Sequence, residues 1–177
     1  MISIIMGSDS DLPVMAAAAQ TCKEFQIPCE VTVVSAHRTP ERMYAFARDA
    51  RSRGISVIIA GAGGAAHLPG MVAALTTLPV IGVPVRTAFL DGLDSALSIL
   101  QMPRGVPVAT VAVNNSRNAA LLAMRILALN DGEVANRLDH FVAAQQDDVR
   151  QVVVNIEAHG WESHLDLLNR KRADANA

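Results

Sequence analysis

Two histidines of this chain, His37 and His67, stand in loops whose other residues are mostly small or hydroxyl-bearing. An imidazole gives up and takes up a proton near neutral pH, so each can act as a general acid and base. His67 is the sole polar side chain in the run from Gly61 to Gly70, and small neighbours let backbone N–H groups approach a bound molecule. We expect this run to be a pocket wall with one reactive group, although a tight structural connection would also explain it.

A second concentration of polar groups is the stretch from Gly7 to Asp11, which follows an apolar run. Gly7 permits a sharp turn, and Ser8 and Ser10 offer hydroxyls where a following helix has unpaired N–H groups, an arrangement that suits a phosphate. One aspartate, Asp9 or Asp11, is expected to cap the helix, and the other to hold a ribose hydroxyl. Capping alone would also explain this loop.

The loop that carries the first histidine runs from Ser35 to Pro40. Thr39 and Pro40 suit the N-cap and the first position of a helix, and they need no functional explanation. Arg38 can bind a phosphate or carboxylate through two N–H groups, and His37 can move a proton. A solvated histidine is the alternative for this loop taken by itself.

Two further arginines, Arg86 and Arg104, lie near proline-containing turns. Each can contact an anion, and a surface or subunit salt bridge explains each equally well. The stretch Asn114 to Asn118 is expected to cap the helix that follows it.

Strand-like and helix-like runs alternate over the first 130 residues, which predicts βαβ units, a parallel sheet and helices on both of its faces. In such sheets ligands bind outside the carboxyl ends of the strands, where the loops above begin. Pro84 is expected to break the fourth strand. The predicted strands are Ile2 to Met6, Cys29 to Val34, Val57 to Ala60, Val80 to Val83 and Val108 to Val113, and the predicted helices are Pro13 to Phe25, Pro40 to Arg53, Leu68 to Leu75, Leu90 to Leu100 and Asn118 to Leu129.

The remaining chain has a different pattern, so residues 1–130 are predicted as the α/β core and 131–177 as a helical extension of one overall domain. Asp131 to Glu157 is polar with periodic apolar positions, which favours one long helix or two shorter ones. Gly160 should end it, Trp161 to Arg172 should form a terminal helix, and Ala173 to Ala177 should fray. The extension is expected to pack on a neighbouring subunit, or else on its own sheet.

Composition narrows the class of protein further. The chain has 177 residues, of which 51% are hydrophobic and 3% aromatic, with a formal net charge of −2. We find no basic stretch for nucleic acid, no membrane-length apolar run and no signal peptide. Cys22 and Cys29 lack zinc-type spacing and are expected to be reduced thiols of a cytoplasmic protein.

Several familiar site patterns are missing from the sequence. There is no phosphate loop ending in Gly-Lys-Ser/Thr, no Gly-x-Ser-x-Gly nucleophile elbow and no dinucleotide fingerprint after Gly61. The histidines and the scattered acids form no recognisable metal set. We therefore expect no metal and no cofactor.

Taken together, the loops resemble those of the N5-carboxyaminoimidazole ribonucleotide mutase family of purine biosynthesis, also called phosphoribosylaminoimidazole carboxylase catalytic subunits. Arg38 and His67 match the mutase type; in the animal-type carboxylase a lysine follows the loop histidine, and Arg-Ser-Asn replaces the stretch ending in His67. The loop Asn114 to Asn118 and the tail after Leu129 look like those of the fused plant and fungal carboxylases. The matching motifs are Met6-Gly-Ser-Asp-Ser-Asp11, Ser35-Ala-His-Arg-Thr-Pro40, Gly61-Ala-Gly-Gly-Ala-Ala-His-Leu-Pro-Gly70, Gly82-Val-Pro-Val85, Gln101-Met-Pro-Arg-Gly-Val-Pro107 and Asn118-Ala-Ala-Leu-Leu-Ala123.

The resemblance implies a three-layer flavodoxin-like α/β/α fold, a homo-octamer, a ribonucleotide substrate, no cofactor, and fusion or pairing with an ATP-dependent carboxylating synthetase. By this resemblance His37 is the catalytic histidine, and His67 is assigned with it to the catalytic pair, as a group that orients the carboxylate or carbon dioxide. The substrate-binding positions it predicts are Gly7, Ser8, Asp11, Ser35, Ala36, Arg38, Gly61, Ala62, Gly63 and Leu68.

The reaction that it implies moves a carboxylate from the exocyclic amine of an aminoimidazole ribonucleotide to ring carbon four. Decarboxylation, retention of carbon dioxide and attack by the ring carbon form the simplest route, with His37 moving the proton. Two alternatives stay open. One is a carboxylase that takes free carbon dioxide, and the other is a nucleotide-binding module without catalysis.

Overall fold

A computed structural model describes the backbone of residues 1–175 and the side chains of residues 1–173. Its centre is a sheet of five parallel strands in the order β2-β1-β3-β4-β5. This order is that of the flavodoxin-like doubly wound fold, which confirms the predicted fold class. The strands are β1 (Ile2–Met6), β2 (Cys29–Val33), β3 (Val57–Gly63), β4 (Val80–Val85) and β5 (Ala109–Thr110).

The three inner strands are apolar because helices cover both faces of the sheet. Every residue of β1 and of β4 is buried, as are all residues of β3 except Gly63. The edge strand β2 alternates between partly buried and exposed residues. Burial on both faces explains why the inner strands read as continuous apolar runs in the sequence.

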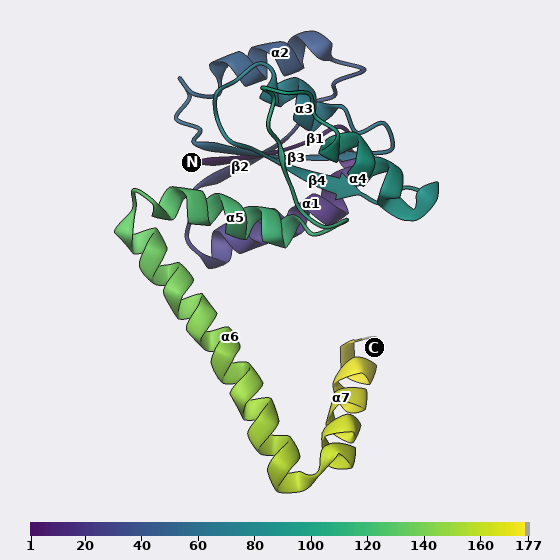
Figure 1. Ribbon diagram of the computed structural model, residues 1–177, viewed down its shortest axis with the longest axis vertical. Coiled ribbons are helices and arrows are strands. Elements are labelled where there is room, and N and C mark those ends of the chain that lie inside the picture. Colours follow the sequence, from purple (N-terminus) through teal and green to yellow (C-terminus); the bar gives the residue numbers. More distant parts are fainter. Residues whose placement is uncertain (176–177) are drawn as a thin grey trace. The chain divides into compact units, whose positions relative to one another are not determined.

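Two helical layers enclose the sheet (Figure 1). On one face α1 (Leu12–Glu24) packs against α5 (Ser116–Ala128). The opposite face carries α2 (Pro40–Asp49), α3 (Leu68–Ala73) and α4 (Leu93–Leu100), whose apolar side chains join one core cluster with the sheet. Members of that cluster include Ile5, Val34, Phe46, Val72 and Ile99.

The order in which strands are added to the sheet reverses between β1 and β3. The chain leaves β1 for β2 on one side and then returns to β3 on the other side. The loops that follow these strands therefore diverge and leave a crevice at the carboxyl ends, the usual ligand position in open α/β sheets.

Several predicted boundaries needed correction. Pro84 lies inside β4 instead of ending it, because β5 pairs only with Ile81 and Gly82 and the proline therefore interrupts no ladder on that side. The fifth strand is accordingly shorter than predicted. The predicted helix Leu90 to Leu100 begins as a short 3₁₀ turn, η2 (Leu90–Gly92), where Asp91 and Gly92 have positive φ angles of 54° and 90°.

The chain divides into two compact units, Met1–Val134 and Ala135–Ala177. The polar tail forms one helix, α6 (Gly132–His159), and Gly160, at a φ of 81°, ends it as predicted. The terminal helix α7 (Trp161–Ala175) includes Ala173, which was predicted to fray, whereas residues 176–177 lie outside the described residues. No helix in the described part of the chain is long and apolar enough to cross a membrane.

Candidate functional site

A cavity of about 400 Å³ lies at the carboxyl ends of the strands, within the usual volume range of small-molecule sites. Loops after β1, β2, β3 and β4 all contribute to it, as expected for a crevice at the reversal of strand order. Its walls consist of Gly7, Ser8, Ser10, Asp11, Ser35, Ala36, His37, Arg38, Ala62, Gly63, Ala65, His67, Leu68 and Thr87.

The two predicted histidines meet in this cavity. Nε2 of His37 lies 2.7 Å from Nδ1 of His67, and the ring planes meet at 83°, with centroids 4.9 Å apart. A hydrogen bond between these nitrogens needs one ring to donate and the other to accept, so the tautomer of one ring fixes that of the other. When one of the two rings carries an extra proton, the N–H···N hydrogen bond between them is kept. When both rings carry one, two N–H groups face each other and the hydrogen bond is lost.

His67 reaches its partner because of its backbone position. It stands at the N-cap of α3, and its side chain makes no capping hydrogen bond there. The imidazole is thus available to His37, which stands thirty residues earlier in the loop after β2. Both side chains are exposed to solvent in the isolated chain, so a bound molecule can reach them.

Arg38 joins the second loop to the first. Its terminal Nη2 donates to the carbonyl of Gly7 at 3.3 Å, and its Nε donates to the hydroxyl of Ser35 at 3.4 Å. These long hydrogen bonds orient the guanidinium toward the first loop and leave other N–H groups for an anion.

Thr39 and Pro40 stand at the N-cap and the first position of α2, as predicted, but the Thr39 hydroxyl makes no capping hydrogen bond to this helix. It donates to the carbonyl of Ser35 at 3.1 Å and accepts from the backbone N–H of the same residue at 3.3 Å. Local bonds of this kind compete with capping. They close the loop on itself and hold His37 at its apex.

The first loop is also arranged differently from the prediction. Asp11 stands at the N-cap of α1, but its side chain makes no capping hydrogen bond. Ser8 caps the short helix η1 (Asp9–Asp11) by accepting from the N–H of Ser10 at 3.4 Å. The Ser8 hydroxyl donates to Asp9 at 2.9 Å. Burial raises the pKa of Asp11 above its usual value, although hydrogen bonds from Ser8, Ser10 and Gly7 partly oppose this.

Gly61 is the one predicted substrate-binding residue that does not line the cavity. It is buried in β3, and a Cβ atom there would lie 2.4 Å from the sulfur of Met15 in α1. This glycine is needed for the packing of a helix on the sheet. The sequence pattern placed it with the glycine-rich loop that follows, which is why it was predicted to bind substrate. Gly64 carries the turn instead, with a φ of 64°.

Three lining residues were absent from the predicted substrate-binding positions: Ser10, Ala65 and Thr87. The first two belong to loops already identified, and their neighbours were favoured in each. Thr87 follows β4, outside every loop that the sequence pattern indicated. Arg86 itself forms an ion pair with Asp91 at 2.9 Å, and neither Arg86 nor Arg104 lines the cavity.

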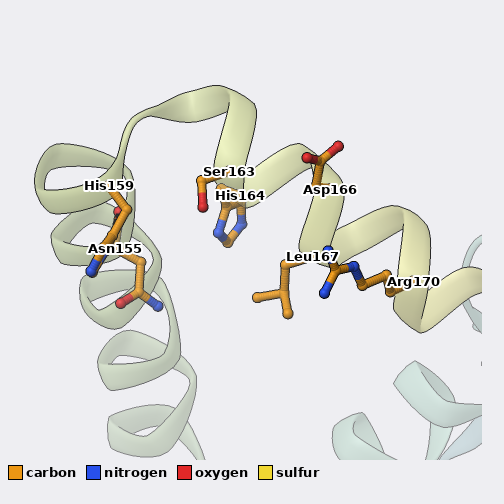
Figure 2. A pocket seen from close by; sticks show the side chains of 7 residues that line it. All are labelled: Asn155, His159, Ser163, His164, Asp166, Leu167 and Arg170. Atoms are coloured by element: carbon orange, nitrogen blue, oxygen red, sulfur yellow. Dashed lines mark hydrogen bonds between the residues drawn. The ribbon is translucent and has the colours of Figure 1, made fainter.

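A second hollow of about 350 Å³ lies between α6 and α7 in the C-terminal unit (Figure 2). Its side chains are partly or fully exposed. His159 Nδ1 donates to the backbone carbonyl of Asn155 at 3.3 Å. Across the described residues, no group of three or more histidine, cysteine or acidic side chains could hold a metal ion. Of these two hollows, the one in the α/β core has the paired histidines and the arginine that a catalytic site requires.

A parallel flavodoxin-like sheet with paired histidines and an anion-suited loop at its switch point defines an α/β protein that handles a small polar molecule. The AIR carboxylase family matches residues 1–148. The chain belongs to this family.

Relatives of two lengths are similar to it. The phosphoribosylaminoimidazole carboxylase of Saccharomyces cerevisiae is 60% identical over 166 residues, which are 94% of this chain and 29% of that protein. The N5-carboxyaminoimidazole ribonucleotide mutase of Pyrococcus horikoshii is 56% identical over 165 residues, 93% of both chains. This chain thus spans about three tenths of the fungal relative and nearly all of the archaeal one.

The fold has a solved counterpart in the crystal structure of PurE from Treponema denticola. That chain is 27% identical and superposes with a TM-score of 0.78 over 89% of this chain and 97% of its own length.

Proposed function

We propose that this protein is an isomerase that converts N5-carboxyaminoimidazole ribonucleotide to 4-carboxy-5-aminoimidazole ribonucleotide. The observation that carries the proposal is the contact between His37 and His67 at 2.7 Å, on the wall of the ligand-sized cavity. A migration of a carboxylate from nitrogen to carbon needs one proton given and one taken, and a hydrogen-bonded imidazole pair can do both. The archaeal relative, which is matched over 93% of its length, bears the name of this activity.

The proposed reaction has two halves. In the first, the bond from the exocyclic nitrogen to the carboxyl carbon breaks, carbon dioxide leaves, and protonated His37 gives its proton to that nitrogen. In the second, ring carbon four attacks the carbon dioxide, and neutral His37 removes the proton from that carbon. The atoms and the charge balance without a cofactor, and the enzyme returns to its starting protonation state.

In both halves of the reaction, His67 acts as the hydrogen-bond partner of His37. Its ring nitrogen fixes which tautomer His37 adopts and stabilises the imidazolium that forms when the ring-carbon proton is taken. In proton transfer, a catalytic base is commonly oriented by a second group that hydrogen-bonds to it, and His67 stands in this relation to His37.

Substrate binding is assigned to the first loop of the cavity and to Arg38. The hydroxyl of Ser8, the N–H groups of η1 and α1 and the guanidinium of Arg38 would hold the phosphate. Asp11 would accept hydrogen bonds from a ribose hydroxyl.

The decisive experiment is turnover of the purified protein without ATP, in both directions, with and without added bicarbonate. Interconversion of the two carboxylated nucleotides that is independent of bicarbonate is the expected outcome. Conversion only from the uncarboxylated nucleotide, rising with bicarbonate, would instead establish a carboxylase, the activity named for the fungal relative. Binding of the nucleotide without conversion in any direction would leave a binding module.

Assembly, partners and location belong to the same proposal. We propose a homo-octamer, because the C-terminal unit exposes large apolar side chains that a second copy would cover, among them Val149, Val153, Trp161 and Leu165. Pairing with a carboxylating synthetase follows from the reaction, since the substrate carbamate must be made by such an enzyme. A cytoplasmic location stays a prediction.

A further inference from the structure

Thr87 is a cavity residue that the proposed reaction has not yet used. It follows β4, beside the strand β3 that supplies Ala62 and Gly63 to the same wall. A Cβ atom at Gly63 would lie 2.8 Å from Cγ2 of Thr87, so the threonine methyl group lies directly over the glycine. The glycine leaves the space that this methyl group fills.

The hydroxyl of Thr87 is engaged elsewhere. Its Oγ1 lies 3.0 Å from the carbonyl of Phe89 and 3.1 Å from Oδ2 of Asp94. A hydroxyl has one hydrogen to donate, and both neighbours are acceptors. The hydroxyl is thus held by its own loop and by the first turn of α4, and the methyl group is left to contact Gly63.

Ser95, the next residue of α4, fixes the other half of this wall. Its side chain is fully buried; its hydroxyl accepts from the N–H of Gly64 at 2.8 Å and donates to the carbonyl of Val85 at 2.7 Å. One side chain therefore ties the turn that leads to His67 to the end of β4. Asp94 and Ser95 together hold an apolar wall in place.

We propose that the methyl group of Thr87 keeps the released carbon dioxide inside the cavity during the interval between the two halves of the reaction. Asp94 and Ser95 position the wall to which this methyl group belongs. This inference rests on the proposed function. Carbon dioxide is small and apolar, and its loss to water is prevented by a wall that offers no space and no polar group. If it escapes, the amine keeps the proton taken from His37, the uncarboxylated nucleotide is the product, and water reprotonates the histidine.

The test compares two substitutions at one position. Thr87→Ser removes the methyl group and keeps the hydroxyl, whereas Thr87→Val keeps a methyl group and removes the hydroxyl. The readout is the fraction of substrate released as uncarboxylated nucleotide, after subtraction of decay without protein. For a ¹³C-labelled carboxylate, loss of label to unlabelled bicarbonate measures the same escape.

For Thr87→Ser we expect the released fraction to rise about fourfold, the factor that corresponds to one buried methyl group. Thr87→Val should release close to the wild-type fraction. It should unfold at a lower temperature, because Asp94 loses a donor and its other oxygen is already buried without a hydrogen-bond partner among the described residues. Thr110→Ser, which removes a methyl group from β5 outside the cavity, is the matched control. It should leave the fraction released as uncarboxylated nucleotide unchanged.

An unchanged released fraction in Thr87→Ser would overturn the inference. Equal release by the serine and valine variants would also overturn it, because the hydroxyl would then be the group that matters. Failure of the proposed function looks different, since the wild-type protein itself would then not interconvert the two nucleotides.

Discussion

His37 is the residue on which the proposed chemistry depends most. Asparagine at this position is polar and of similar shape near the backbone, but it cannot exchange a proton. We expect His37→Asn to lower kcat by roughly 10²–10⁴-fold, the usual contribution of a general acid–base group, with KM little changed. Steady-state kinetics with the amine-carboxylated nucleotide measures both parameters.

Arg38→Ala serves as the contrasting variant for that experiment. It removes a cavity cation that lies next to the proposed proton carrier, so it should weaken nucleotide binding in calorimetry and leave more of kcat than His37→Asn does. Turnover near the wild-type level in His37→Asn would remove this histidine from the proton-transfer role.

Asp11 makes a pH-dependent contribution to stability. Burial raises its pKa in the folded protein, so between the unfolded and folded pKa values the folded state binds more protons than the unfolded state does. The favourable contribution is complete below the usual carboxyl pKa of 3.8 and is lost as pH rises through the folded pKa. We therefore expect Asp11→Asn to gain stability over the wild type as pH rises from about 3 to about 7.

Urea unfolding of both proteins across this range measures the difference. Asp9→Asn is the matched control, because the same charge is removed from the neighbouring exposed position. If the free energy of unfolding differed between the wild type and Asp11→Asn by the same amount at every pH, Asp11 would not be the source of the pH dependence.

At the scale of elements, the packing of α1 on β3 depends on Gly61. A methyl group there would meet the side chain of Met15, which is flexible enough to move at a cost. We expect Gly61→Ala to destabilise the protein by about 1 kcal/mol, at the lower end for overpacked cores. The double variant Gly61→Ala, Met15→Ala should lose less than the sum of the single losses.

Thermal or urea unfolding of the three variants tests this packing. Gly132→Ala, at a helical position where a Cβ atom would meet nothing within 4 Å, is the control and should not destabilise. Strict additivity of the two single substitutions would show that the methyl group and Met15 do not interact.

The elements also explain the chemistry of the two cysteines. Cys22 is buried on α1, and burial raises the pKa of its thiol to about 12, so the reactive thiolate is suppressed. Both cysteines are free in the structure, in agreement with the prediction of reduced thiols.

At the scale of the whole molecule, the proposed assembly predicts a mass eight times the 18.8 kDa of one chain. Light scattering after size-exclusion chromatography measures it. The pair Val149→Glu, Val153→Glu places charges one turn apart on an exposed apolar stripe of α6 and should produce smaller species. Gln151→Glu adds charge between them without removing an apolar group, and it should leave the assembly intact. A monomeric wild-type protein would contradict the octamer.

Local patterns in the sequence determined the parallel sheet, its helical layers and the three loops at its edge. Apolar runs of strand length, helical spacing and Gly160 act within a few residues, so they can be read without the fold. The same patterns identified nearly every residue of the cavity, because strand ends of a parallel sheet lie at one edge.

Only the tertiary structure decided which groups touch. His37 meets His67 across thirty residues, Ser95 reaches Gly64 across thirty-one, and Gly61 faces Met15 from another layer. Each contact depends on the register of the strands and on the seating of a helix, which no local pattern specifies. A glycine required by a neighbouring helix and a glycine required by a ligand look alike in sequence, and the space around the Cα atom distinguishes them.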